Sequence, residues 1–292
     1  MKRFILAAGL PLLLVAGALV PAASGCGDDE TSSAAPARPH VDRFDSAAAY
    51  RLLREQVEMG PRPAGSRTSR RLAARLRRLL PDGSYQAVPG GLRNVVGRVP
   101  GRGKGFVVLG AHYDTKDSPG FVGANDGASG TAVAVQLART IRPRSLRRTV
   151  VFVLFDGEES PRGTPDGLFA QKGLRGSKVA ARRYREARAM VLLDFVGDRR
   201  LRIPREGSSD QELWGRLRTA ARRVGAASAF PRETGGTLLD DHRPFLEQGV
   251  PSIDLIDFDF DCFHQRCDDL SAVSERSLDI TGETVLRLLA SL

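Results

Sequence analysis

Four short runs of aliphatic and β-branched residues constrain the fold of this chain most strongly. They cover 106–110, 149–155, 189–193 and 252–256. Each run has the length of a single strand, and its nearly continuous apolar character is typical of a largely buried strand. Helical patterns follow at 128–141, 211–224 and 277–291. Strands that alternate with helices predict an α/β fold, a three-layer sandwich whose mostly parallel central sheet is flanked by helices.

Two further helical patterns precede the first of these strands. Residues 46–59 have a helical pattern, and the segment 68–80, TSRRLAARLRRLL, spaces its apolar residues at three and four positions beside a basic face. That spacing is typical of an amphipathic helix. No internal repeat divides residues 44–292, so we expect them to form one domain.

The charge of the chain is strongly basic. It has 44 Lys and Arg against 34 Asp and Glu in 292 residues, which gives a net charge of +10. The excess is mostly arginine spread along the chain, and one tryptophan and four tyrosines leave few aromatic rings for stacking on bases. We interpret the charge as a solvated basic surface and expect no nucleic-acid partner.

Three cysteines are too few for a disulfide-dense scaffold.

The first 25 residues have the character of an export signal. Lys2 and Arg3 precede an apolar stretch over 4–20, and small residues follow up to Cys26. The sequence Ala-Ser-Gly-Cys is similar to a bacterial lipoprotein cleavage site, at which the cysteine becomes the lipidated first residue. An ordinary secretory signal with an incidental cysteine is the alternative. Residues 26–43 are polar and small, and they predict a flexible tether.

Export leads to several further expectations. We expect the protein on the outer side of the membrane, either anchored by lipid or secreted, with membrane contact through that anchor only. An oxidising compartment favours disulfides, and with Cys26 lipidated the remaining pair is Cys262 and Cys267. We expect the domain to be a monomer.

Side chains of the kinds that bind metal ions follow the predicted strands. In chain order they are His112, Asp126, Glu158, Glu159, Asp194 and His264. Loops at the carboxyl ends of parallel strands converge, and imidazole and carboxylate donors suit zinc. Singly these residues have ordinary explanations, such as a helix cap for Asp126 or a solvated acidic pair for the two glutamates. Jointly they predict a zinc site with an open position for catalysis.

Five sequence motifs resemble the zinc-dependent aminopeptidase superfamily, peptidase family M28, and more narrowly its glutaminyl-peptide cyclotransferase branch. They are AHYDTK, GANDGASGTA, FDGEES, LLDFVG and DDHRPFLEQGVP…FH, and they run in order between Arg93 and Leu289. The resemblance implies the phosphorylase/hydrolase-like fold of zinc exopeptidases. It also implies an enzyme.

The chain has no Gly-x-Ser-x-Gly or HExxH motif, so serine hydrolases and helix-borne zinc peptidases are excluded.

The resemblance implies a role for each matching residue. Asp126, Glu159 and His264 match the ligands of the catalytic zinc, and Glu158 matches the general acid/base. Asp194 and Asp240 match acids that support that glutamate through hydrogen bonds in the cyclases. In two-zinc aminopeptidases His112 and Asp194 would hold a second ion with Asp126 bridging, so we expect one zinc ion and leave two open.

Two features favour the cyclase branch. The segment from Asp240 to Leu246, DDHRPFL, resembles the cyclase form, whereas aminopeptidases usually keep only a Ser-Asp-His version. Gly176-Ser177 also follows Glu159 only after a long insertion, and cyclases carry a similar one.

Two other features depart from the animal cyclases, which place tryptophan before the last histidine ligand and in the insertion. Phe263 stands at the first position, and the sole tryptophan, Trp214, lies in a predicted helix. We expect Phe263, Phe169 or Phe121 to provide the aromatic wall of the substrate pocket.

The sequence thus predicts a zinc-dependent enzyme that acts on the N-terminus of a peptide or protein. As a glutaminyl-peptide cyclotransferase it would convert N-terminal Gln to pyroglutamate and release ammonia, with Glu158 moving the proton. The alternative is an aminopeptidase of the same family, in which Glu158 activates a water. An inactive, lipid-anchored binding protein is the alternative of another class, and the intact glutamate pair argues against it.

Overall fold

The computed structural model of this chain describes residues 37–292. The predicted signal (1–25) and the cysteine predicted to carry lipid, Cys26, lie outside the described residues. The end of the predicted tether is joined to the domain, because the His40 N–H donates to the Val224 carbonyl at 3.0 Å. The Arg43 and Phe44 N–H groups both donate to Glu283 Oε1. The packed part of the chain therefore begins slightly before Phe44.

Six strands form one mixed sheet in the order β1-β2-β4-β3-β5-β6. They are β1 (Ser84–Val88), β2 (Leu92–Val99), β3 (Phe106–His112), β4 (Thr149–Phe155), β5 (Met190–Leu193) and β6 (Ser252–Leu255). β4, β3, β5 and β6 run parallel, and β1 and β2 pair antiparallel at one side. The expected α/β sandwich with a mostly parallel sheet is confirmed.

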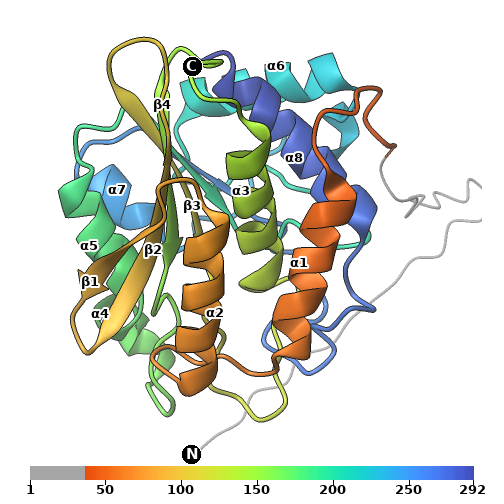
Figure 1. The fold of residues 1–292 in the computed structure, drawn as a ribbon. Coiled ribbons are helices and arrows are strands. Elements are labelled where there is room, and N and C mark those ends of the chain that lie inside the picture. The colour runs from red at the N-terminus through yellow and green to blue at the C-terminus, as the bar shows by residue number, and fades with distance from the viewer. Residues whose placement is uncertain (1–36) are drawn as a thin grey trace, which may run out of the picture. The chain divides into compact units, whose positions relative to one another are not determined.

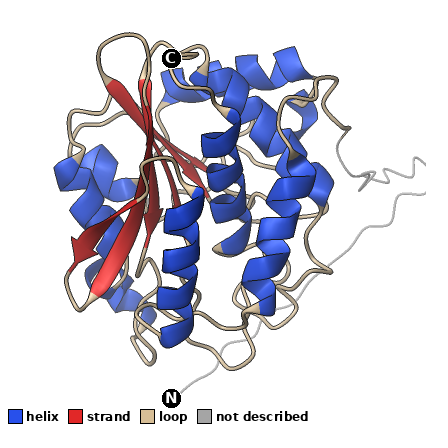
Figure 2. Ribbon diagram, viewed as in Figure 1, coloured by secondary structure: helices blue, strands red, loops and turns tan. Residues whose placement is uncertain are grey.

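Helices cover both faces of the sheet (Figure 2). They are α1 (Ser46–Glu58), α2 (Arg67–Leu79), α3 (Ala128–Thr140), α4 (Phe169–Lys172), α5 (Arg175–Arg183), α6 (Gln211–Val224), α7 (Arg243–Glu247) and α8 (Glu275–Leu289), with short 3-10 turns η1 (Asp166–Leu168) and η2 (Ala227–Ala229). Helices α1, α2, α3, α6 and α8 lie on one side, and α4, α5 and α7 lie on the other (Figure 1). Among the described residues, no helix has the length and apolar character needed to span a bilayer.

The predicted elements form because their apolar residues find a buried face. Every residue of β4 is buried, as its continuous apolar run predicts. In α2, Leu72, Ala73 and Leu76 face the core while the arginines face solvent, and the Ser66 side chain caps the helix by accepting from the Ser69 N–H at 3.0 Å. The predicted helices and strands are all present within one or two residues of their expected ends.

Helix α3 lies unusually close to the sheet, and a glycine permits this. A Cβ at Gly130 would lie 2.0 Å from the Leu193 carbonyl oxygen, so only glycine fits. The close approach brings the start of α3, and with it the loop that carries Asp126, against the ends of β3 and β5. We call the end of the sheet at which β3, β4, β5 and β6 terminate the carboxyl edge, and the end at which they begin the amino edge.

Candidate active site

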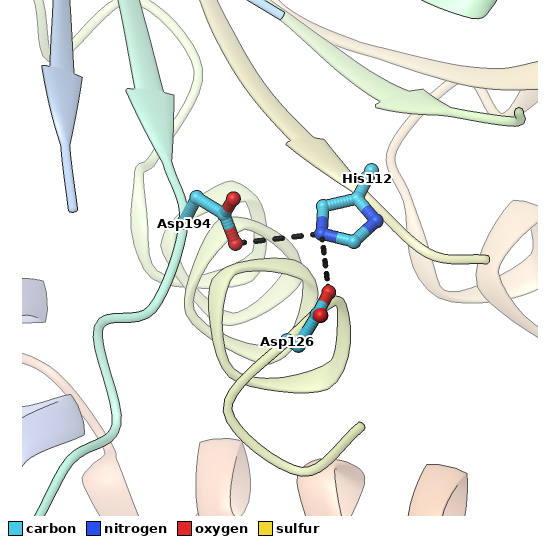
Figure 3. Close-up of side chains that lie close together, drawn as sticks. All are labelled: His112, Asp126 and Asp194. Carbon is cyan, nitrogen blue, oxygen red and sulfur yellow. Dashed lines mark ion pairs between the residues drawn. The ribbon is translucent and has the colours of Figure 1, made fainter. Parts of the chain in front are cut away.

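A histidine and two carboxylates meet at the carboxyl edge. His112 is the last residue of β3, Asp194 follows β5, and Asp126 stands two residues before α3. His112 Nε2 lies 3.2 Å from Asp126 Oδ1 and 3.4 Å from Asp194 Oδ1. Figure 3 shows the imidazole pointing between the two carboxylates. All three side chains are buried.

A second group shares Asp126 with the first. His264 Nε2 lies 3.1 Å from Glu159 Oε1 and 3.5 Å from Asp126 Oδ2. The two oxygens of Asp126 therefore face two different imidazoles, one on each side. Loops distant in sequence have brought together the expected ligand trio of Asp126, Glu159 and His264, and the second trio of His112, Asp126 and Asp194.

The donor atoms of both trios fit a divalent metal ion. Within each trio, the candidate ligand atoms all lie within 4.8 Å of one another. Among the described residues, Asp126 Oδ2, Glu159 Oε1 and both nitrogens of His112 are buried without a hydrogen-bond partner. Leaving buried carboxylates unpaired is costly, and a cation held by imidazole and carboxylate donors removes that cost. The chemistry is that of zinc and does not distinguish one ion from two.

Glu158 lies beside the Asp126–Glu159–His264 trio and is buried. Burial raises the pKa of Glu158 well above its ordinary value, and the nearby charge of Glu159 raises it further. The loop is held by Asp114, whose carboxylate accepts the N–H groups of Gly157, Glu158 and Glu159 at 3.0 to 3.2 Å. A carboxyl at such a position whose pKa is raised is suited to take a proton from a substrate and to return it.

A buried cluster of acids and one histidine extends behind Glu158. Burial, followed by the charges of Asp194 and Asp241, raises the pKa of Asp240 well above its ordinary value. The neighbouring His242 directs Nδ1 toward Asp254 Oδ2 at 3.5 Å and Nε2 toward Glu206 Oε2 at 3.1 Å. The Ser208 hydroxyl also lies 2.9 Å from His242 Nε2. The sequence motif predicted Asp240, but it gave no sign that Glu206 and Asp254 would meet His242.

Two charged residues that sequence reasoning missed hold the Asp126 loop in place. Arg62 is fully buried and donates to the carbonyls of Val122 at 2.5 Å and Gly123 at 3.0 Å. Burial lowers the pKa of Arg62 to about 10, and it stays a cation at neutral pH. Asp268 accepts the N–H groups of Asn125 and Asp126 at 2.6 and 3.0 Å. Nothing in the local sequence distinguishes either residue from a surface charge.

A cavity of about 310 Å³ opens above these groups. Its wall includes the carboxylates of Asp126, Glu158, Glu159, Asp194 and Asp240, together with His264 and the rings of Phe169, Phe195, Phe258 and Phe263. The predicted wall residues Phe263 and Phe169 are among them. Phe121 is not, because it is buried behind His264 and packs edge-on against the imidazole with 6.1 Å between ring centroids. Phe195 and Phe258 were not predicted.

The loop that carries His264 is closed by the expected disulfide between Cys262 and Cys267. His264 has a positive φ of 54°, a left-handed conformation that is uncommon for histidine. Its ring stacks on that of Phe263 at a centroid distance of 3.8 Å. The disulfide and the stacked ring thus hold a backbone conformation that aims His264 into the cavity.

Comparison with known proteins agrees with this geometry. The profile of peptidase family M28 matches residues 94–289, which include both metal-binding trios and Glu158. The chain is 29% identical over 276 residues to a glutaminyl-peptide cyclotransferase from Bos taurus, covering 77% of this chain and 74% of the relative. It is 27% identical over 196 residues to aminopeptidase YwaD from Bacillus subtilis, covering 62% of this chain but only 39% of that protein.

Among solved structures, the chain is similar to the glutaminyl cyclase of an Acidobacteriales bacterium. The TM-score is 0.74 at 29% identity, and the match covers 88% of this chain and 97% of that one. The similarity therefore extends over nearly the whole described domain.

Proposed function

The chain belongs to peptidase family M28, and within that family we propose that it is a zinc-dependent glutaminyl-peptide cyclotransferase. It would convert an N-terminal glutamine of a peptide or protein to pyroglutamate and release ammonia. The similarity to bovine and bacterial glutaminyl cyclases supports this choice. We propose residues 44–292 as the catalytic domain.

The observation that carries the proposal is the small cavity in which Glu158 meets a metal-binding trio. Its volume of about 310 Å³ suits one residue of a peptide rather than a long segment. Phe258 and Phe263 are exposed by 48% and 38%, which is unusual for phenylalanine, and both lie on the cavity wall. An apolar wall around a curled N-terminal residue excludes water, which a cyclase must do to avoid hydrolysis.

We assign Glu158 as the group that moves the proton. Its carboxylate takes a proton from the substrate α-amine, whose nitrogen attacks the side-chain amide carbon of the same residue. The new C–N bond forms, the bond from that carbon to the amide nitrogen breaks, and Glu158 returns the proton to the departing ammonia. The amine is already tethered to the amide, so proximity supplies much of the acceleration. We propose that Asp194 and Asp240, which line the same cavity, support Glu158.

We propose Asp126, Glu159 and His264 as the zinc ligands. When bound there, a zinc ion would polarise the amide carbonyl and stabilise the negative charge that develops on its oxygen. The raised pKa of Glu158 matches its role, because a carboxylate of ordinary pKa is too weak a base for an amine.

An aminopeptidase is the second candidate, and the His112–Asp126–Asp194 trio favours it. Two trios that share Asp126 could hold two ions, as the two-zinc members of the family do. The relative from Bacillus subtilis supports the same alternative. In that case Glu158 would activate a water that attacks the first peptide bond.

We also propose that the protein works outside the cytoplasm. The basic, apolar and small-residue segments of 1–25 support export, and Cys26 supports a lipid anchor. The disulfide between Cys262 and Cys267 fits an oxidising compartment.

One assay separates the candidates. The zinc-loaded protein is incubated with a peptide that begins with glutamine and, separately, with leucine amide, and Glu158→Gln serves as the control. Ammonia together with a blocked peptide N-terminus is the expected result. Free leucine without cyclisation would replace the cyclase with the aminopeptidase, and turnover of neither substrate would overturn both.

A further inference from the structure

The amino edge of the sheet is as basic as the carboxyl edge is acidic. Its basic part consists of three segments: 100–105 before β3, 141–148 before β4 and 184–188 before β5. Together these three carry eight arginine and lysine side chains and a single acid, Glu186. The part of the edge before β6 is more mixed, because Asp210 and Glu212 line a cleft there with Arg148 and Arg188. In Figure 1 this edge lies at the top, where α3 and α8 end.

Backbone contacts hold the three segments together as one surface. The Gly103 N–H donates to the Arg147 carbonyl at 2.8 Å, and the Arg144 N–H donates to the Pro100 carbonyl at 2.7 Å. The Arg188 N–H donates to the Phe106 carbonyl at 2.9 Å, which ties the third segment to the start of β3. The surface is therefore built by the fold, and its charges are held close together although they come from distant parts of the chain.

The middle segment carries the most available charge. Arg142, Arg144 and Arg147 are exposed. Within residues 37–292, none of these three side chains takes part in a hydrogen bond or ion pair. Like charges placed together without counter-ions repel one another, so the arrangement lowers stability slightly and is compensated when an anionic partner binds.

The chain enters the described domain beside this same surface. Val41 and Arg43 line a cleft of about 870 Å³ whose other wall includes Ile141, Arg142 and Leu146. The apolar stretch over 4–20 lies upstream of this entry point in the sequence. A membrane attachment of that stretch or of Cys26 would therefore join the domain through a segment that lies beside the amino edge.

We propose that the amino edge binds the surface of an anionic phospholipid bilayer, which replaces the expectation that an anchor is the one membrane contact. Lipid headgroups present many phosphates side by side, which suits exposed arginines that are spread over neighbouring segments, whereas the segments offer no exposed aromatic ring on which a base could stack. The parallel strands separate the two edges by about 20 Å, given about 3.3 Å per residue. Docking would therefore leave the cavity open to peptides on the side away from the membrane. This inference goes beyond the proposed reaction, and the binding does not depend on it.

Vesicle sedimentation with the full chain tests the proposal. Binding is compared between phosphatidylcholine vesicles and vesicles that also contain phosphatidylglycerol, at low and high salt. The apolar N-terminal stretch contributes equally to both vesicle types, so their difference reports the charge. We expect tighter binding to the anionic vesicles, and high salt should abolish this difference. The triple variant R142Q/R144Q/R147Q should weaken binding to the anionic vesicles on the order of a hundredfold, roughly fivefold for each arginine.

The matched control removes the same charge from another face. Arg67, Arg71 and Arg78 are exposed on α2, and R67Q/R71Q/R78Q should weaken binding by no more than about threefold. Thermal unfolding checks that each variant folds. If a triple variant does not fold, its three single substitutions are tested instead. Any of three results would overturn the proposal. They are equal losses of vesicle binding in the two triple variants, no preference for anionic vesicles, and tighter binding to a DNA duplex than to the vesicles.

Discussion

The two edges of the central sheet place charge in opposite ways. At the carboxyl edge, carboxylates such as Asp126, Glu158 and Asp240 are buried and closely spaced. At the amino edge, arginines such as Arg142 and Arg144 lie in solvent. The carboxylates and the arginines lie in loops at opposite ends of the same strands. The two edges therefore differ in how deeply these loop side chains are buried.

Burial determines what each edge requires. Buried acids without partners cost free energy, so the carboxyl edge needs a cation or protons to be stable, and it can use both in catalysis. Exposed arginines cost little free energy, and their charges attract anions over a distance. The amino edge therefore suits a partner that presents many anionic groups.

The largest effect should come from Glu158. We expect Glu158→Gln to lower the rate of pyroglutamate formation by about 10²–10⁴, because it removes the proton carrier and no proposed metal ligand. Metal content, measured by elemental analysis, should be unchanged. The control is Glu186→Gln at the amino edge, which should change the rate by less than about twofold. Comparable rates for wild type and Glu158→Gln would remove Glu158 from the mechanism.

Arg62 should dominate the stability of the carboxyl edge. Replacing it by methionine leaves the Val122 and Gly123 carbonyls without their donor and leaves the buried charges of Asp126 and Asp268 without their cation. We expect the free energy of unfolding in urea to fall by about 3–5 kcal/mol. Arg142→Met at the amino edge should stay within about 0.5 kcal/mol of wild type. If Arg62→Met and Arg142→Met lowered the free energy of unfolding equally, burial would not explain the difference between the two edges.

Metal removal should make stability depend on pH. Burial raises the pKa of Asp241, Asp257 and Asp268 to about 7. Their protons bind more tightly in the folded protein than in the unfolded chain, whose carboxyls titrate near 4, so raising the pH from about 4 to about 7 lowers the free energy of unfolding. After treatment with a chelator, the unfolding temperature should fall by about 5 °C or more between pH 5 and pH 8.

The zinc-loaded protein provides the comparison for this pH effect. Its ligands must lose their protons to bind the ion, so binding strengthens as the pH rises and offsets the loss. The unfolding temperature of the loaded protein should therefore change little over the same range. A metal-free protein that becomes more stable toward pH 8 would contradict the assignment.

The disulfide should have the smallest effect. The double variant Cys262→Ser with Cys267→Ser opens a short loop, so we expect a loss of about 2 kcal/mol in the free energy of unfolding. Zinc affinity, measured by competition with a chromogenic chelator, should weaken modestly, because His264 is then aimed by its ring contacts with Phe263 and Phe121 without the covalent closure of the loop. Unchanged affinity and stability would show that the disulfide does not hold this loop.

The sequence was sufficient to predict the parallel strands and the residues that follow them. Apolar runs such as β4 are continuous, and the rule that parallel strands present their carboxyl ends at one edge brings His112, Glu159 and Asp194 together. The β1–β2 hairpin was not predicted, because β1 lies at the side of the sheet and mixes exposed polar residues with few apolar ones. Helices as short as α4 and α7 give too few turns for a periodic pattern.

The supporting residues of the site could not be predicted for a different reason. Arg62, Asp114 and Asp268 act by hydrogen bonds to backbone groups of other loops, which only the folded chain brings near. Phe121 was one of three phenylalanines expected to provide the aromatic wall, yet its ring is buried and packs edge-on against His264. Which side of a loop a ring occupies depends on packing that spacing alone does not encode.

Diffraction from crystals of the zinc-loaded protein, collected at the zinc absorption edge, would locate the metal ion. We expect the strongest anomalous peak at the carboxyl edge, about 2.0–2.2 Å from carboxylate oxygens of Asp126 and Glu159 and from His264 Nε2. A protein that binds zinc elsewhere, with no peak among these three side chains, would contradict this expectation.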